Sequence, residues 1–493
     1  MTGPMTTMPN TRAPLRIVMR HELRMLIVDH SLLLVLGLLA LLIGYGFYNG
    51  LVQTQMRDAM AASVQQADAA GGQSLIERMR RIESGQEQPG PFNNPANPAT
   101  LGNSAGQHAV MESAALAPIA IGQSDMMPNY YRIGTRSKVE FMYDSEIESP
   151  WNLLSGHFDL SFVIVYLLPL LIFALSYNLL SSDREDGTER MLLSQSLGVG
   201  TLALGKLLPR AASVLAVAGL LPAVLLLLFR PETRALGEAG MLLGAIGLVI
   251  AYGAFWFALA FAVNAMRLSS SANALVLIAA WAMLTLVAPV VLNLVAERAH
   301  PAPSRTELSI QTRAIQADNL RRYDDLFSGD YRYIDEPETL QAKDGRIVIP
   351  PRTMASFLAR RDMDARVDRL LDRFDATLIR QQALVDRISF LSPAILTYEG
   401  LTALAGTDGK RYLAFREQVG AFHDDWRAHF EPMIVNGIAM RERDLRALPR
   451  WPAAADDRAD MLQGTGWRIL VMAAITLLTA LAGIHRLRRY SVA

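Results

Sequence analysis

Six long runs of apolar residues without a charged side chain are the feature that most restricts how this 493-residue chain can fold. The hydrocarbon core of a bilayer is about 30 Å thick, so a helix needs about 20 apolar residues to cross it. The runs are residues 32–48, 160–180, 211–229, 241–263, 274–296 and 469–484. We therefore predict an all-α fold: a polytopic membrane protein with six transmembrane helices and extracytoplasmic helical regions.

Basic residues at both ends of the chain indicate the orientation of these spans. Arginines cluster before the first run and after the last one, and short segments rich in arginine and lysine stay in the cytoplasm. Both termini are therefore predicted to be cytoplasmic, with the chain in the cell's inner (plasma) membrane. The predicted organisation is a cytoplasmic interfacial helix at 1–30, the first span at 31–50, extracytoplasmic region one at 51–159, spans two to five at 160–296, extracytoplasmic region two at 297–467, the sixth span at 468–485 and a cytoplasmic tail at 486–493.

The two extracytoplasmic regions differ in character. Region one begins with a predicted helix at 52–70, and its residues 85–106 are rich in Gly, Pro, Asn and Gln, which is typical of a loop. Region two contains apolar residues at helical spacing over 353–391 and again over 408–440. The second of these helices carries an apolar stripe, for which a bundle core is favoured over a peptide-binding groove: Tyr412, Phe415, Val419, Phe422, Trp426 and Phe430. His423 and His429 are interpreted as solvated.

The sequence lacks the residues that several classes of functional site require. The chain has no cysteine, so disulfides and cysteine metal sites are excluded, and its balanced charge gives no reason to expect nucleic acid as a partner. Residues 200–206 match most of a phosphate-binding loop, but Leu207 stands where a magnesium-binding Ser or Thr is required. We predict no catalytic residue, no metal site and no cofactor in this chain. Small residues at Gly240 and Gly244 permit close helix packing, either within the bundle or across a dimer.

Two segments on the predicted cytoplasmic side are candidates for binding to lipid or to another protein. Residues 15–28 place Arg16, Arg20 and Arg24 among apolar residues directly before the first span, which predicts a helix on the inner membrane surface bound to anionic lipid. After the second span, residues 183–190 form a charged segment interrupted by Gly187. A turn of this kind is suited to docking against a cytoplasmic protein.

These features resemble the permease subunits of type-2 ATP-binding-cassette (ABC) transporters. In that family a surface helix precedes the first span, and the loop after the second span carries a Glu-x-Gly-Thr-like turn, a Leu-Leu-Ser element and a Gly-Lys pair. The matching residues are Glu185, Gly187, Thr188, Leu192, Leu193, Ser194, Gly205 and Lys206, and Asp186 fills the variable place in the turn. Residues 391–394 (Leu-Ser-Pro-Ala) and 404–408 (Leu-Ala-Gly-Thr-Asp) are similar to a subgroup with a large extracytoplasmic helical insertion between the fifth and sixth spans.

The resemblance implies a membrane-spanning permease that is not itself an enzyme. A separate cytoplasmic ABC ATPase would bind ATP and magnesium, and a second permease copy or a paralogue would complete the membrane path, most often for export. The residues implied in coupling to the ATPase are Glu185, Asp186, Gly187, Thr188, Glu189 and Lys206, together with the surface helix that carries Arg16, Arg20 and Arg24.

The residues also leave another class of function open. In this alternative the chain is a membrane-anchored scaffold or sensor whose extracytoplasmic helical bundle binds a ligand or a protein, and the spans only hold it in place. The absence of charge from the middle four spans fits this hypothesis, and it also makes proton coupling through the helices unexpected. A membrane-embedded enzyme would need a nucleophile and a base, and the sequence shows no such pair.

Overall fold

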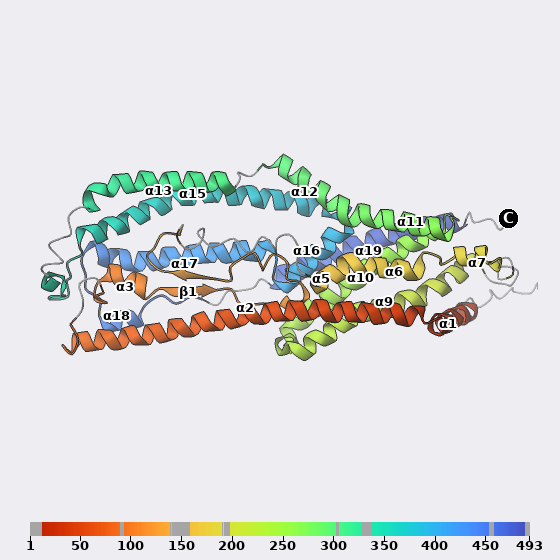
Figure 1. Ribbon diagram of the computed structural model, residues 1–493, viewed down its shortest axis with the longest axis horizontal. Coiled ribbons are helices and arrows are strands. Elements are labelled where there is room, and N and C mark those ends of the chain that lie inside the picture. Colours follow the sequence, from red (N-terminus) through yellow and green to blue (C-terminus); the bar gives the residue numbers. More distant parts are fainter. Residues whose placement is uncertain are drawn as a thin grey trace, which may run out of the picture.

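A computed structural model describes residues 12–88, 93–138, 140, 158–189, 191, 198–301, 305–327, 337–452 and 458–488. The molecule is elongated, with a membrane bundle at one end and a second helical region at the other (Figure 1). Over the described residues the fold is all-α apart from small β elements, which confirms the predicted fold class.

Six helical segments are long and apolar enough to cross a membrane, and each contains one of the six apolar runs. The first span lies in α2 (Ser31–Glu83), the third in α9 (Val199–Phe229), the fourth in α10 (Ala239–Asn264) and the sixth in α19 (Arg458–Arg488). The second span consists of α5 (Leu160–Phe162), η3 (Val163–Leu167) and α6 (Leu168–Ser176), and continues into α7 (Ser181–Glu185). The fifth consists of α11 (Ser270–Trp281), η6 (Ala282–Val287) and α12 (Ala288–Ala299).

Helix α10 lies at the centre of the membrane bundle. Its Tyr252 and Trp256 are fully buried, and it packs against α6, α9 and α19. The small-residue stripe predicted from the sequence faces α19: a Cβ on Gly240 would lie 3.3 Å from Leu462, and one on Gly244 would lie 3.4 Å from Thr465. The stripe thus serves packing within the chain.

The part of the molecule beyond the membrane bundle, here called the distal region, begins with the second half of α2. That helix continues without a break to Glu83, so the helix predicted at 52–70 belongs to it. The predicted loop 85–106 contains α3 (Pro98–Ser104), which the Asn97 side chain caps by accepting a hydrogen bond from the amide of Ala99. After α3, strands β1 (Gln107–Val110) and β2 (Tyr130–Ile133) form an antiparallel hairpin, and η1 (Ala117–Ile119) lies between them.

The rest of the distal region comes from the segment between the fifth and sixth spans. This segment contains α13 (Arg305–Phe327), α15 (Pro351–Ile388), η8 (Ser389–Leu391), α16 (Pro393–Ala405), α17 (Gly409–Val435) and α18 (Glu442–Arg446). Helix α16 differs from the others because it packs into the core of the membrane bundle, against α10 and α19. Helices α13 and α15 run side by side along one edge of the molecule (Figure 1). Helices α15 and α17 confirm the two helices predicted at 353–391 and 408–440.

The apolar stripe of α17 forms the core of the distal region. Five residues of the stripe are buried and pack with residues of α3 and the hairpin: Phe415, Val419, Phe422, Trp426 and Phe430. This confirms that the stripe is a bundle core, and the alternative of a peptide-binding groove is wrong. The Trp426 indole N–H donates to the carbonyl of Gly102, 2.8 Å away. His423 is fully buried, because it lies on the side of α17 that faces its neighbours, so the prediction that it is solvated was also wrong.

The far tip of the distal region is held by charged contacts between α18 and α2. Glu442 accepts hydrogen bonds from Arg80 (2.8 Å) and Arg446 (2.7 Å). These two guanidinium groups lower the pKa of the Glu442 carboxyl to about 2.

Candidate functional site

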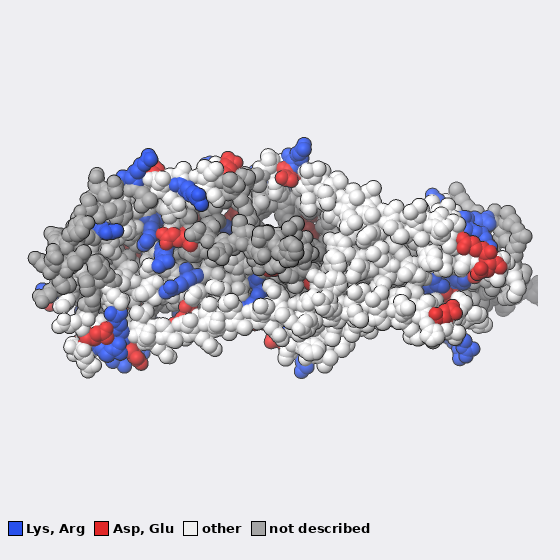
Figure 2. All heavy atoms as spheres, viewed as in Figure 1, with Lys and Arg blue, Asp and Glu red and all other residues white. Residues whose placement is uncertain are grey.

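Charged side chains gather at the end of the membrane bundle that carries α1 (Arg12–Val28) and α7, at the right of Figure 1. A surface almost without charge separates them from the charged distal region (Figure 2). We call this cluster, formed by α1, α7 and the first turns of α9 and α11, the α7 end.

The turn after α7 is open to solvent. Gly187 has a φ of +73°, a left-handed conformation that glycine adopts readily and that ends helices at this position. Asp186, Gly187 and Thr188 are exposed, and the Thr188 hydroxyl donates to the carbonyl of Asp183 (3.2 Å). Glycine is therefore required here by the backbone geometry, and the turn presents a carboxylate and a hydroxyl beside it.

Glu185 is engaged within the chain. Its two carboxylate oxygens accept hydrogen bonds from the backbone N–H and the hydroxyl of Ser270, both at 2.7 Å. Ser270 begins α11, and a carboxylate at a helix N-terminus is favourable because it meets free N–H groups and the positive end of the helix dipole. Arg184 adds a hydrogen bond to the carbonyl of Leu268. The second span is thus joined to the start of the fifth.

Lys206 is also engaged within the chain. Its ammonium group lies 2.6 Å from a carboxylate oxygen of Asp183, and the lysine is buried. The surrounding residues 200–206 are helical, because α9 begins at Val199. They do not form a phosphate-binding loop. Lys206 instead joins the third span to α7.

Helix α1 packs against the first turns of α9. A Cβ on Gly205 would lie 2.5 Å from Cγ1 of Val18, so a glycine is needed for this close approach. Arg16, Arg20 and Arg24 are exposed on α1, as expected for a helix that contacts lipid headgroups.

A buried ion pair that the sequence did not reveal holds α1 in place. Glu22 is 3% exposed and pairs with Arg210 of α9, which is 6% exposed and also donates to the carbonyl of Leu175 in α6. A signal was available: Val18, Glu22 and Leu26 are spaced by four residues, which places a carboxylate on the apolar face of the helix. A buried carboxylate needs a charged or hydrogen-bonding partner.

The structure therefore divides the predicted coupling residues into two groups. Glu185 is exposed but hydrogen-bonded to Ser270, and Lys206 is buried and paired with Asp183. Asp186, Gly187 and Thr188 are all exposed, and the side chain of Thr188 bonds to the carbonyl of Asp183. Glu189 is half-buried. Leu192, Leu193 and Ser194 of the family-like pattern lie outside the described residues.

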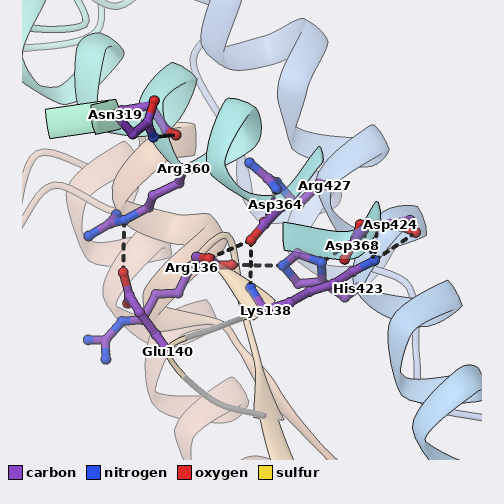
Figure 3. Close-up of polar contacts among 12 residues, drawn as sticks. Arg136, Lys138, Glu140, Asn319, Arg360, Asp364, Asp368, His423, Asp424 and Arg427 are labelled. Carbon is purple, nitrogen blue, oxygen red and sulfur yellow. Dashed lines mark hydrogen bonds and ion pairs between the residues drawn. The ribbon is translucent and has the colours of Figure 1, made fainter. Parts of the chain in front are cut away.

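A second cluster of charged groups lies in the distal region (Figure 3). Asp364 of α15 accepts hydrogen bonds from the Ser137 hydroxyl, the backbone N–H of Lys138 (3.0 Å) and Arg427 of α17. Burial raises the pKa of the Asp364 carboxyl, and the bonds from Ser137 and Arg427 only partly oppose this. His423 lies 2.7 Å from the carbonyl of Arg136 through Nε2.

These contacts fasten the segment after β2 between α15 and α17. Each of these groups meets a partner from the same chain, and no group of three His, Asp or Glu residues suited to a metal ion occurs among the described residues. The arrangement is that of a structural cluster, so the α7 end is the stronger candidate for a functional site.

Comparison with known proteins finds one partial match. Residues 353–454 match a family model described as a domain of unknown function, DUF3526. The matched segment contains α15 except for its first two residues, together with η8, α16, α17 and α18, and it makes up most of the region between the fifth and sixth spans. No curated protein matches the chain.

Proposed function

We propose that this chain is the permease subunit of an ATP-driven transporter, most consistent with an exporter, and that it works with a separate cytoplasmic ABC ATPase. The observation that carries the proposal is the exposed turn Asp186–Gly187–Thr188. It follows a short helix that continues the second span and is bonded to the third and fifth spans. The type-2 permease resemblance rests in part on Gly187 and Thr188 of this turn, and the DUF3526 match lies in the segment where the subgroup's insertion would fall.

The contacts of α7 allow a conformational change in a partner to be transmitted to the membrane bundle. Helix α7 continues the second span, Glu185 joins it to the fifth span, and Lys206 joins it to the third. A partner that binds the turn differently in two states would therefore act on three spans at once, as any conformational coupling requires. ATP and magnesium would be held by that partner.

Helix α1 would support the same contact from the lipid surface. Its exposed Arg16, Arg20 and Arg24 are placed to meet anionic lipid headgroups, while Glu22 and Val18 hold it against α9. On this proposal the α7 end and both termini face the cytoplasm, the distal region lies outside the plasma membrane, and a second permease copy or a paralogue completes the path.

One observation favours the alternative of a scaffold or sensor. The far tip of the distal region holds an open cavity of about 910 Å³ between the end of α2 and α18, lined by Met79, Glu83, Met440, Arg441 and Arg446 among others. A cavity of this size is large enough for a small molecule or a short peptide. In this alternative the α7 turn has no partner.

Co-purification separates the two proposals. The tagged chain is expressed with the ATPase encoded nearest its gene, extracted in mild detergent and examined for a stable complex. A complex that Asp186→Arg disrupts, and that Asp425→Arg on the exposed face of α17 does not, supports the permease. Binding of the ATPase that is unaffected by Asp186→Arg removes the turn from the proposal, and the absence of any complex favours the scaffold or sensor.

A further inference from the structure

The second and fifth spans are both interrupted by a π-helical turn at the same distance before a proline. In the second span, η3 ends at Leu167 and Pro169 follows; in the fifth, η6 ends at Val287 and Pro289 follows. The N–H of Leu168 bonds to the carbonyl five residues earlier in η3, and that of Ala288 does the same in η6. Such turns are rare in helices and occur often at functional sites.

The prolines account for the broken hydrogen-bond ladder. A proline has no N–H, so a carbonyl four or five residues earlier loses its donor. An unpaired carbonyl is costly inside a membrane, where water cannot replace the donor.

Each span receives a replacement donor from a neighbouring helix. The Tyr252 hydroxyl of α10 donates to the carbonyl of Val165, four residues before Pro169, at 2.7 Å. The Ser392 hydroxyl, at the N-cap of α16, donates to the carbonyl of Leu284, five residues before Pro289, at 2.9 Å. Tyr252 and Ser392 are both fully buried. Each hydroxyl thus supplies a donor to one carbonyl that lies within reach of a proline without an N–H.

The two turns lie at matching depths from a shared end. The Ser181 hydroxyl is 2.8 Å from that of Ser270, and Glu185 binds Ser270 as described above, so the second and fifth spans are joined at the α7 end. Val165 and Thr285 each lie four residues before the proline of their span. Ser181 is sixteen positions after Val165, and Ser270 is fifteen positions before Thr285, so the two arms contain nearly equal numbers of residues.

We propose that the second and fifth spans bend at these two π turns and that the segments between the turns and the α7 end move as one unit. Asn264 binds the end of this unit to α10 through the carbonyl of Ser176 (2.9 Å), so the inner end of α10 moves with it. Two arms with nearly equal numbers of residues, joined at the α7 end and each able to bend at its π turn, can tilt together without breaking the contacts at the α7 end.

Helix α16 connects the two π turns to the distal region. It contacts both η3 and η6, and it continues through Gly406, in a left-handed conformation with φ +64°, to α17. It also lies inside the segment that matches DUF3526. A tilt of the two arms therefore reaches the core of the distal region through one helix. The inference concerns motion within the chain and holds whether or not the partner at the α7 turn is an ATPase.

Distances between pairs of spin labels in lipid discs test the proposal directly. The chain has no cysteine, so labels attach only where cysteines are introduced. One pair replaces the exposed Leu275 and Val290, on either side of η6, and a control pair replaces the exposed Leu41 and Met56 in α2. Both pairs are fifteen residues apart, about 22 Å along a helix, and the control segment contains no proline.

We expect the distance distribution across η6 to be at least about twice as wide as that in α2. A third pair, at Ala174 and Leu275, lies on the two joined arms and is expected to give a narrow distribution. Pro289→Ala restores the missing N–H and should narrow the distribution across η6, whereas Ser392→Ala removes the hydroxyl donor and should shift it. The α2 pair, measured in both variants, shows that the fold is intact.

A distribution across η6 as narrow as that in α2 would overturn the proposal, because the fifth span would then be rigid at this turn. A wide distribution between Ala174 and Leu275 would overturn the idea of a single unit. If neither Pro289→Ala nor Ser392→Ala changes the distribution across η6, the proline and the hydroxyl do not control the bend.

Discussion

The buried pair Glu22–Arg210 allows a quantitative test of how α1 is held against the membrane bundle. The perturbation is Glu22→Gln, which keeps the size of the side chain and removes its charge. Arg210 is only 6% exposed, and its buried charge would then face a neutral amide oxygen and the carbonyl of Leu175 in place of a carboxylate. Removing one member of a buried ion pair typically costs about 3–5 kcal/mol, because the remaining charge is left uncompensated.

The pair lies near the end of the bundle, so we expect a value toward the lower limit of this range, about 3 kcal/mol, in the free energy of unfolding. Arg210→Met should cost a comparable amount, since it leaves the carboxylate buried. The double variant should be less destabilised than the sum of the two, with a coupling of about 1–3 kcal/mol. Unfolding in mixed micelles with increasing denaturing detergent measures all four proteins. His21→Gln, on the exposed side of the same helix, is the control and should change stability by less than about 0.5 kcal/mol.

Additive effects of the two single substitutions would refute this reasoning. They would mean that Glu22 and Arg210 contribute independently, and that α1 is held by its apolar contacts and by lipid alone.

Three further predictions follow from single contacts. Gly205→Ala should release α1 from α9, because the added Cβ would lie 2.5 Å from Val18. Faster cleavage by trypsin within α1 would show this release. Gly200→Ala is the control, because a Cβ at that position has no other atom within 4 Å. Tyr252→Phe should lower stability by about 1–3 kcal/mol in the same micelle assay, because it leaves a buried carbonyl without its donor. Glu442 has its pKa lowered from 4.5 to about 2, so its stabilising contacts are fully present above pH 4.5 and are lost as the pH falls toward 2. As the pH falls from 4.5 to 2, amide hydrogen exchange in α18 should therefore become faster in the wild type than in Glu442→Gln, which has no carboxyl group to protonate.

The sequence predicted the membrane bundle well because the bilayer imposes a simple rule. Twenty apolar residues without charge have few alternatives to a spanning helix, and all six runs lie in helices long enough to cross. The two long distal helices were predicted for a similar reason, since apolar residues at helical spacing leave one face to be buried.

The sequence did not reveal contacts between residues far apart in the chain. Glu22 and Arg210 are 188 positions apart, and the π turns depend on donors from α10 and α16. The hairpin after α3 was also missed, because two strands of four residues give too short an alternation to be recognised.

For the predicted coupling residues, too, the sequence did not reveal the contacts within the chain. The sequence grouped Glu185, Asp186 and Lys206 as one docking element, but it could not tell which of them are bonded within the chain. Glu185 and Lys206 are held by Ser270 and Asp183, and this leaves Asp186 as the acidic residue best placed for a partner. A test that replaces Glu185 would therefore disturb the contact between the second and fifth spans as well as any docking.

The most direct test of the central claim is the rate of ATP hydrolysis by the complex of this chain with its ATPase in lipid discs. Wild type is compared with Asp186→Ala and with the control Asp425→Ala in the distal region. We expect the ATPase to associate with the chain, and Asp186→Ala alone to change its hydrolysis rate. An ATPase that does not associate, or a rate that is the same in all three proteins, would contradict the permease proposal.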